Sequence, residues 1–284
     1  MLLNYNTIVV LNRKSEFMSK VIVLDLDQTL RSLETSNNCN ELKVVLRPQI
    51  TTLLQKLSDV KNKGIDSVIF TSATRTSAIK YFLEKLPEEC RGVFTEIISR
   101  ENFPEPKLGT RENYLYRVGE NKIVTALDYD EILFFEDSQT EYKFLEELFD
   151  KENYTDYPVP DKSVTFVNLP FYPRTSSDMY ALKELAKQSD SLKEKVNDYF
   201  TLMVNEPGCK IMANVIDEFI SKDNPKGLIN LDIEEFDEYE ANLRVKNIEI
   251  RKILSKDENL RNKYFDLKND YYLKEEIEDD KELL

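Results

Sequence analysis

Short apolar runs alternate with amphipathic segments over roughly the first 170 residues of the chain. These runs are rich in β-branched and aromatic residues, are too short for typical helices, and predict buried strands at residues 21–24, 67–72, 93–98, 131–138 and 164–167. Between them, apolar residues recur at helical spacing in segments 48–61, 72–86, 122–127 and 142–149. Strands that alternate with helices in this way predict an α/β fold with a doubly wound parallel sheet.

The pattern changes beyond about Ser176, where helical spacing continues and no strand is predicted. The helical segments are 179–185, 192–204 and 211–220, followed by a charged helical tail. We therefore expect three parts: a leader (1–17), an α/β domain (18–175) and an all-α C-terminal extension (176–284). The leader is ambiguous, since residues 8–11 could add an edge strand or the whole segment could be cloning-derived, with Met18 as the natural start.

The chain carries a net charge of −14, half of which lies in residues 231–284. This charge argues against general nucleic-acid binding through phosphate contacts, although a basic partner or a basic phosphorylated substrate stays open. The acidic tail is predicted to be a solvated helical face, and a surface that docks a protein partner is the alternative.

The residue types present exclude several kinds of chemistry. With no histidine, the chain cannot use a Ser-His-Asp triad or a histidine metal ligand, and its six glycines form no Walker A or Gly-x-Gly-x-x-Gly motif. The three cysteines form no Cys-x-x-Cys pair, and none is followed six residues later by the arginine of a cysteine-dependent phosphatase. Their spacing predicts a reducing, intracellular compartment, cytoplasmic or nuclear, and no apolar run is long enough for a membrane span.

Pairs of acidic residues follow two of the predicted strands. Asp25 and Asp27 come directly after the first strand, and alternation along an extended chain lets both face one crevice. Glu136 and Asp137 end the fourth strand. Because unpaired buried carboxylates are costly, we expect a hard cation, Mg²⁺, between these oxygens at the rim of the sheet.

These residues stand in an order that resembles the motifs of the haloacid-dehalogenase (HAD) phosphotransferases. The stretch Asp25-Leu-Asp-Gln-Thr29 is similar to their first motif, Thr71 at a strand end to the second, and the acidic pair to the fourth. Lys122, which opens the predicted 122–127 helix, matches the lysine of the third motif, with Lys107 as the alternative. The resemblance covers about residues 21–170.

The resemblance implies a role for each matched residue. Asp25 would attack phosphorus, and Asp27 would protonate the leaving oxygen and then activate water. Thr71, Ser72 and Lys122 would bind the phosphoryl group, although either Ser72 or Thr74 could cap the following helix. The implied Mg²⁺ ligands are Asp25, the Asp27 backbone carbonyl and Asp137, with Glu136 acting through water. Glu136 departs from the aspartate usual at its position, which leaves open which acid of the pair touches the metal.

Within this superfamily the chain resembles the FCP/SCP-like (NLI-interacting-factor-like) phosphatases. Residues 25–30 differ from their usual Asp-Leu-Asp-Glu-Thr-Leu only at Gln28, and segments 44–48 and 68–72 are also similar. Arg31 replaces a common valine and the 31–41 flap is shorter, and both departures are expected to bear on substrate choice. The implied function is Mg²⁺-dependent hydrolysis of phosphoserine or phosphothreonine in proteins. A phosphatase for nucleotides or polynucleotide ends, and an inactive scaffold that binds through the acidic helices, are the alternatives.

The spacing of the motifs predicts that no large cap domain covers the site. The intervals from Asp25 to Thr71 and from Thr71 to Lys122 are each about 50 residues long and must already supply strands and helices of the sheet. A folded cap needs on the order of 50 residues of its own. We therefore expect an open crevice that admits a phosphorylated macromolecule, recognised partly through a loop or short hairpin flap at 31–41 and a loop at 100–113.

Overall fold

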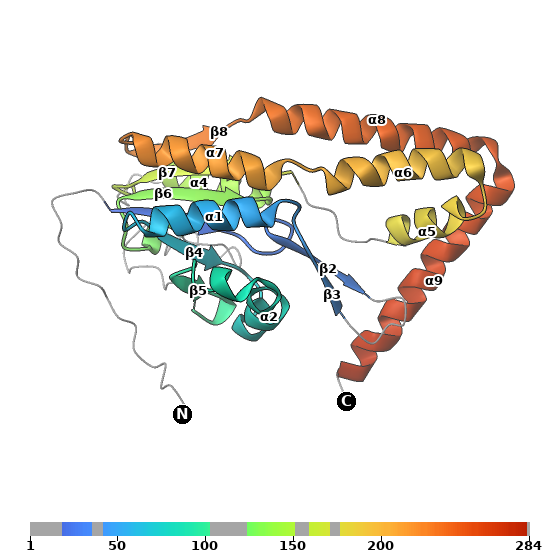
Figure 1. The fold of residues 1–284 in the computed structure, drawn as a ribbon, viewed down its shortest axis with the longest axis horizontal. Helices are drawn as coiled ribbons and strands as arrows, with labels where there is room; N and C mark the ends of the chain where they lie inside the picture. Colours follow the sequence, from blue (N-terminus) through green and yellow to red (C-terminus); the bar gives the residue numbers. More distant parts are fainter. Residues whose placement is uncertain (1–18, 36–41, 103–123, 151–158, 171–176, 283–284) are drawn as a thin grey trace.

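Six parallel strands form the centre of the molecule (Figure 1). The computed structural model describes residues 19–35, 42–102, 124–150, 159–170 and 177–282. The strand order across the sheet is β5 (Glu96–Ile98), β4 (Asp66–Phe70), β1 (Lys20–Leu24), β6 (Glu131–Glu136), β7 (Ser163–Asn168) and β8 (Gly227–Leu231). Every neighbouring pair is parallel. The predicted parallel α/β sheet is therefore confirmed.

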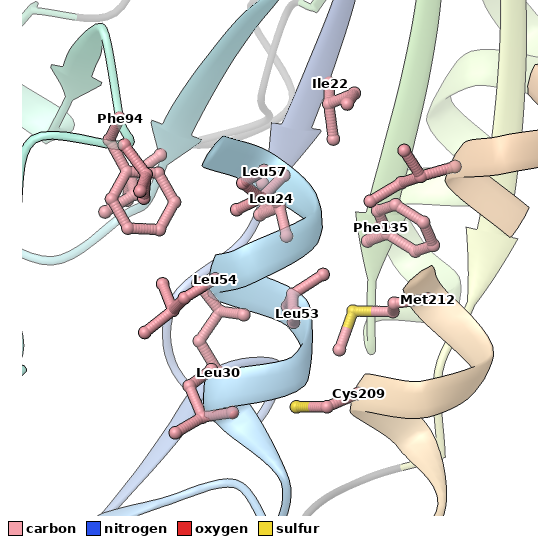
Figure 2. Close-up of a cluster of buried hydrophobic side chains, with 14 of the residues drawn as sticks. Ile22, Leu24, Leu30, Leu53, Leu54, Leu57, Phe94, Phe135, Cys209 and Met212 are labelled. Carbon is pink, nitrogen blue, oxygen red and sulfur yellow. The ribbon is translucent and has the colours of Figure 1, made fainter. Parts of the chain in front are cut away.

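Helices cover both faces of this sheet, because alternate strand residues point to opposite sides. Ile22 and Leu24 of β1 join a core with α1 (Ile50–Lys61) and α7 (Gly208–Ser221), whereas Val21 and Val23 join a second core with α4 (Gln139–Phe149). Figure 2 shows Met212 and Cys209 of α7 beside Leu53 of α1 in the first core. Full burial of each such leucine side chain contributes about 1.5–3 kcal/mol.

A two-stranded antiparallel sheet stands beside the main sheet. Its strands are β2 (Arg31–Thr35) and β3 (Leu42–Leu46), which pair from Arg31–Leu46 to Thr35–Leu42. This confirms the hairpin alternative for the start of the 31–41 flap, while residues 36–41 lie outside the described part of the chain.

The predicted helix at 72–86 is broken in the structure. It consists of α2 (Arg75–Tyr81) and a 3₁₀ turn (Leu83–Lys85), separated by Phe82 at φ −138° and ψ −68°. Phe82 is fully buried beside Phe94, with ring centroids 5.9 Å apart. The ring therefore packs in the first core on the same side as Ala78, and the helical backbone is interrupted at this residue.

Four helices extend beyond the sheet and are called here the helical arm: α5 (Ser177–Ala186), α6 (Asp190–Val204), α8 (Glu234–Lys256) and α9 (Glu258–Glu282). Within it, α6 packs along α8 and α5 packs along α9, as Figure 1 shows. The arm has its own apolar cluster, which includes Leu185, Leu192 and Ile250.

One correction concerns the expectation of helices alone beyond Ser176. Strand β8 pairs with β7 at the edge of the main sheet, from Ser163–Gly227 to Val167–Leu231. A five-residue run of this kind cannot be assigned by periodicity, and its pairing with a distant strand decides its conformation. Helix α7 also lies on the sheet rather than in the arm. The domain division at residues 175 and 176 stays a prediction.

Candidate active site

The carboxyl ends of three adjacent strands bring the expected site residues to one edge of the sheet. Strand β1 lies between β4 and β6, and each of the three runs directly into one of the sequence motifs. Asp25 follows β1 and donates its backbone N–H to Phe135 O at 2.9 Å, while Thr71 follows β4 and donates to Ile98 O at 2.9 Å. These bonds continue the parallel ladders past the strand ends and fix where both side chains start.

Three carboxylates meet at this edge. One oxygen each of Asp25, Glu136 and Asp137 lies within 4.8 Å of the others. Asp25 is 4% exposed and Glu136 is 2% exposed, so their negative charges are mostly withdrawn from water. Buried carboxylates at this distance repel one another unless a cation or a proton intervenes. A set of carboxylate oxygens is the donor set that Mg²⁺ prefers, so the residues present fit the expected metal.

Neighbouring polar groups orient two of these acids. Ser138 donates its backbone N–H to Glu136 Oε1 at 3.2 Å, and the Thr29 hydroxyl donates to Asp137 Oδ1 at 3.5 Å. Thr29 is fully buried, so its position is set by packing. Because Thr29 belongs to the first motif, its contact with Asp137 ties this motif to the fourth.

The carboxylate of Asp27 has a different partner. Its Oδ1 accepts a hydrogen bond from Arg31 Nε at 2.9 Å, and its side chain keeps 30% exposure. The Arg31 side chain is fully buried, and its Nη1 and Nη2 donate to the carbonyl and hydroxyl oxygens of Ser77 in α2 at 3.1 and 3.3 Å. Arg31 therefore connects the first motif to the helix that follows Thr71.

A tight turn separates Asp27 from Arg31. Gln28 has φ +69°, in the left-handed region that side-chain-bearing residues seldom occupy, and its N–H donates to Arg31 O at 2.7 Å. Leu26 O accepts from the N–H groups of both Leu30 and Arg31, at 2.9 and 3.1 Å. Such strained residues persist only where surrounding contacts hold them, and they cluster at functional sites.

Thr71 and Ser72 differ in their surroundings. Thr71 is fully buried, and its Oγ1 accepts from the Ala73 N–H at 3.1 Å, which leaves the hydroxyl hydrogen to donate. Thr74 caps α2, since its side chain accepts from the Ser77 N–H at 3.2 Å. Of the two caps predicted for this helix, Ser72 and Thr74, Thr74 is therefore the one confirmed, and Ser72 is exposed.

The family model for NLI interacting factor-like phosphatases matches residues 20–163, just over half of the chain. The chain belongs to this phosphatase family. The match contains both acidic motifs, Thr71 and Arg31, and it confirms the resemblance to the FCP/SCP-like HAD phosphatases. A comparison with curated proteins gave no match.

Two features expected of this family member fall outside the described residues. Lys122 and the alternative Lys107 both lie in segment 103–123, so the phosphate-binding lysine stays a prediction. The same holds for the tip of the flap, residues 36–41, and for most of the 100–113 loop. Within the described part of the chain, no helix is both long and apolar enough to cross a membrane.

Arg31, which was expected to bear on substrate choice, has a buried side chain that contacts Asp27 and Ser77. Two further residues, Arg47 and Glu206, are buried together behind the turn that follows Asp27 and were not predicted as site residues. Arg47 lies in segment 44–48, which resembles the family, and stands before Pro48, where the sequence predicts a helix start. No local signal points to Glu206, because its partner is distant in the chain.

Proposed function

We propose that this NLI interacting factor-like phosphatase is a Mg²⁺-dependent phosphomonoester hydrolase that acts through an aspartyl-phosphate on phosphoserine or phosphothreonine in proteins. The observation that carries the proposal is the acidic cluster of Asp25, Glu136 and Asp137 at the carboxyl ends of β1 and β6. Asp27 stands beside this cluster with its carboxylate paired to Arg31. The site thus offers one carboxylate for attack and a second for proton transfer.

In the proposed reaction, an Asp25 carboxylate oxygen attacks phosphorus, and the bond from phosphorus to the serine or threonine oxygen breaks. Asp27 gives its proton to that leaving oxygen, which departs as the alcohol. Asp27 then takes a proton from water, whose oxygen attacks phosphorus and releases Asp25 and inorganic phosphate. Arg31 would keep the Asp27 carboxylate apart from the three acids of the cluster, so that it can serve the leaving group.

Several groups of this chain would stabilise the charge on the transferred phosphoryl group. Asp25, Asp137 and the Asp27 backbone carbonyl would hold Mg²⁺, with Glu136 acting through water, and the bound ion would neutralise negative charge on the phosphoryl oxygens. The Thr71 hydroxyl and Ser72 would donate hydrogen bonds, and Lys122 would supply a positive charge.

The deciding experiment replaces Asp25 by asparagine and measures turnover of phosphopeptides and of 3′- or 5′-phosphorylated oligonucleotides, with and without Mg²⁺. Asp25→Asn should cost on the order of 10³-fold or more in kcat, because an amide cannot form the aspartyl-phosphate. Wild-type protein should lose activity in excess chelator and should bind beryllium fluoride only when Mg²⁺ is present.

Asp130→Asn is the matched control, since it makes the same chemical change at the amino-terminal edge of the sheet. Asp130 accepts hydrogen bonds from Ser19 and lies directly before β6. Its substitution should leave kcat within about twofold of wild type. Near-normal turnover of a folded Asp25→Asn protein would exclude the covalent mechanism, and preference for the oligonucleotides would exclude the protein substrate.

A further inference from the structure

Arg47 lies directly behind the turn that carries the candidate catalytic aspartates. Its side chain is fully buried, and among the described residues its guanidinium makes hydrogen bonds to Gln28, Thr29, Pro170 and Glu206. Nη1 donates to the backbone carbonyls of Gln28 at 3.3 Å and Thr29 at 2.9 Å. Two residues of the turn between Asp27 and Arg31 are thus held through their carbonyl oxygens by one side chain.

The opposite side of the guanidinium is paired with Glu206. Nε donates to Glu206 Oε2 at 2.9 Å and Nη2 donates to Glu206 Oε1 at 2.8 Å, which is the bidentate geometry that suits arginine and carboxylate. Burial alone would lower the pKa of Arg47, but the hydrogen bond and charge of Glu206 outweigh this effect and raise it. The buried carboxylate therefore keeps the guanidinium charged and fixed in one orientation.

The backbone around Glu206 is shaped to this ion pair. Gly208 lies so close that a Cβ atom at its position would stand 2.5 Å from Arg47 Nε and 2.5 Å from Glu206 Oε1. Any residue with a side chain would force the pair to move. Glu206 thus supplies the charged partner of Arg47, and Gly208, two residues later, leaves the space that the ion pair occupies.

The groups that hold Arg47 from this side lie beyond the segment that matches the family model. Nη2 also donates to the carbonyl of Pro170 at 2.8 Å, and both Pro170 and Glu206 follow residue 163, where the match ends. These two residues flank the part of the chain that contains α5 and α6. Arg47 therefore contacts the catalytic turn and both ends of the segment that contributes these two helices to the arm.

We propose that Glu206 is a positioning residue for catalysis, which fixes the turn of residues 26–31 through Arg47. The turn needs such support because Gln28 holds a left-handed conformation that its own side chain disfavours. Small displacements of a catalytic carboxylate cost much of its rate, so a loosened turn would slow the reaction without removing a reacting group. The catalytic unit then extends beyond the family-matched segment, at least to the start of α7.

A second buried ion pair allows this role to be separated from general stabilisation. Lys20 Nζ lies 3.1 Å from Glu131 Oε2, and the Glu131 side chain is 1% exposed, as is that of Glu206. Lys20 and Glu131 begin strands β1 and β6, whereas the candidate site lies at the opposite ends of these strands. Glu131→Gln therefore disturbs an ion pair with an equally buried carboxylate away from the catalytic turn.

The experiment compares Glu206→Gln with Glu131→Gln in the full chain, using kcat and KM for a small aryl phosphate and backbone amide exchange in residues 26–31. Both variants should lower the melting temperature. Only Glu206→Gln should reduce kcat, by about tenfold with KM nearly unchanged, because the substrate itself makes no contact with Glu206. Only this variant should also accelerate exchange of the Leu30 and Arg31 amides, which are bonded to Leu26 O.

Gly208→Ala provides a second route should Glu206→Gln fail to fold, since it displaces the pair without removing a charge. Gly92→Ala is its control, because a Cβ there would meet nothing within 4 Å. Gly208→Ala should reproduce the loss of kcat and the faster exchange, whereas Gly92→Ala should show neither. Equal exchange and equal kcat in the Glu206 and Glu131 variants would overturn the proposal. The expected change in kcat rests on the proposed phosphatase activity, whereas the change in amide exchange does not. Failure of the positioning role is therefore distinguishable from failure of the proposed function.

Discussion

Asp25 and Asp27 are two residues apart, but the structure gives their carboxylates different surroundings. Asp25 is nearly fully buried among the acids of the cluster, where a cation would be its natural partner. Asp27 is partly exposed and already paired with Arg31. Different environments of this kind let two carboxylates take different roles, one as nucleophile and the other as acid and base.

The substitution Arg31→Met should reveal whether the arginine positions the Asp27 carboxylate. The variant keeps an apolar side chain but leaves the Asp27 carboxylate without its ion-pair partner. We expect kcat/KM for a phosphoserine peptide to fall about tenfold, because its alkoxide leaving group needs a proton that Asp27 must be positioned to give. The kcat/KM for p-nitrophenyl phosphate should change much less, since its leaving group departs without a proton.

Arg91→Met is the control for Arg31, since Arg91 also donates to backbone carbonyls, those of Leu86 and Glu84, away from the site. Arg91→Met should leave the ratio of the two kcat/KM values, for the phosphoserine peptide and for p-nitrophenyl phosphate, unchanged. If Arg31→Met lowers kcat/KM equally for both substrates, Arg31 stabilises the fold and does not position the proton donor.

The residues that follow strands could be predicted from the sequence, whereas those that support them could not. Asp25, Glu136 and Asp137 each stand at the end of a recognisable apolar run, and parallel strands bring such ends together. Arg47 and Glu206 are 159 positions apart and meet only because α7 packs over α1 beside the sheet. Arg47 lies in segment 44–48, which resembles the family, but nothing in that segment indicates its partner, so the pairing follows from tertiary structure alone.

Strands and helices also differ in how well local sequence determines them. The core strands of the sheet could be predicted because each holds a short run of mostly apolar residues. Strand β8 could not, since it is a half-buried edge strand whose pairing with β7 supplies the decisive hydrogen bonds. Helix α2 is shorter than its helical spacing of apolar residues predicts, because that spacing marks the buried face and not the residue at which the backbone leaves the helix.

Helix α2 follows Thr71 and contains Ser77, the partner of Arg31, so a change at the start of this helix should affect the site. Thr74→Ala removes the side chain that caps the Ser77 N–H and should lower the free energy of unfolding by about 1 kcal/mol. It should also reduce kcat, since Ser77 holds the Arg31 guanidinium. Thermal unfolding and phosphopeptide turnover measure the two effects.

Ser189→Ala is the matched cap deletion in the arm, where the Ser189 hydroxyl accepts from the Leu192 N–H at the start of α6. Its cost in stability should be similar, but kcat should stay at the wild-type value. If Thr74→Ala, like Ser189→Ala, loses stability but keeps the wild-type kcat, α2 is not coupled to the site.

In the whole molecule, the C-terminal part of the chain both forms the arm and, through α7, β8 and the start of α8, completes the α/β core. Phe236 of α8 is buried in the first core with residues of α1 and α7, and β8 extends the sheet. The acidic helices that follow stay a candidate surface for a protein partner, which no contact in the structure tests. The molecule is therefore expected to respond differently to truncations on either side of α8.

We predict that deletion of residues 257–284 leaves turnover of a small aryl phosphate within about twofold, because α9 packs on α5 rather than on the sheet. Deletion of residues 231–284 also removes Phe236, and loss of one buried aromatic side chain costs about 3–5 kcal/mol. The longer deletion should give an unstable, poorly active protein in thermal unfolding and turnover assays. Equal stability and activity of the two truncated proteins would place the whole of α8 outside the core.

The elements between the motifs decide how large a substrate can reach the acidic cluster. The described residues between Asp25 and Thr71 form a hairpin, α1 and β4, and those from Thr71 to Asn102 form α2, three short 3₁₀ turns and β5. None of these elements is a folded cap. Enzymes that act on small metabolites usually close such a cap over the site to exclude water, and this chain lacks one in its described segments.

Phosphopeptides should therefore be hydrolysed with a much higher kcat/KM than sugar phosphates or free nucleotides, by about tenfold or more. A macromolecule can make contacts outside the phosphate site, on the β2–β3 hairpin and on the arm. The part of the arm formed by α5 and α6 begins after Pro170 and ends before Glu206, and both residues bind Arg47 beside the catalytic turn. A kinetic panel across the three substrate classes measures this ranking. A free metabolite that ranks above every phosphopeptide would contradict it, and would mean that the helical arm itself closes over Asp25 as a cap supplied from downstream.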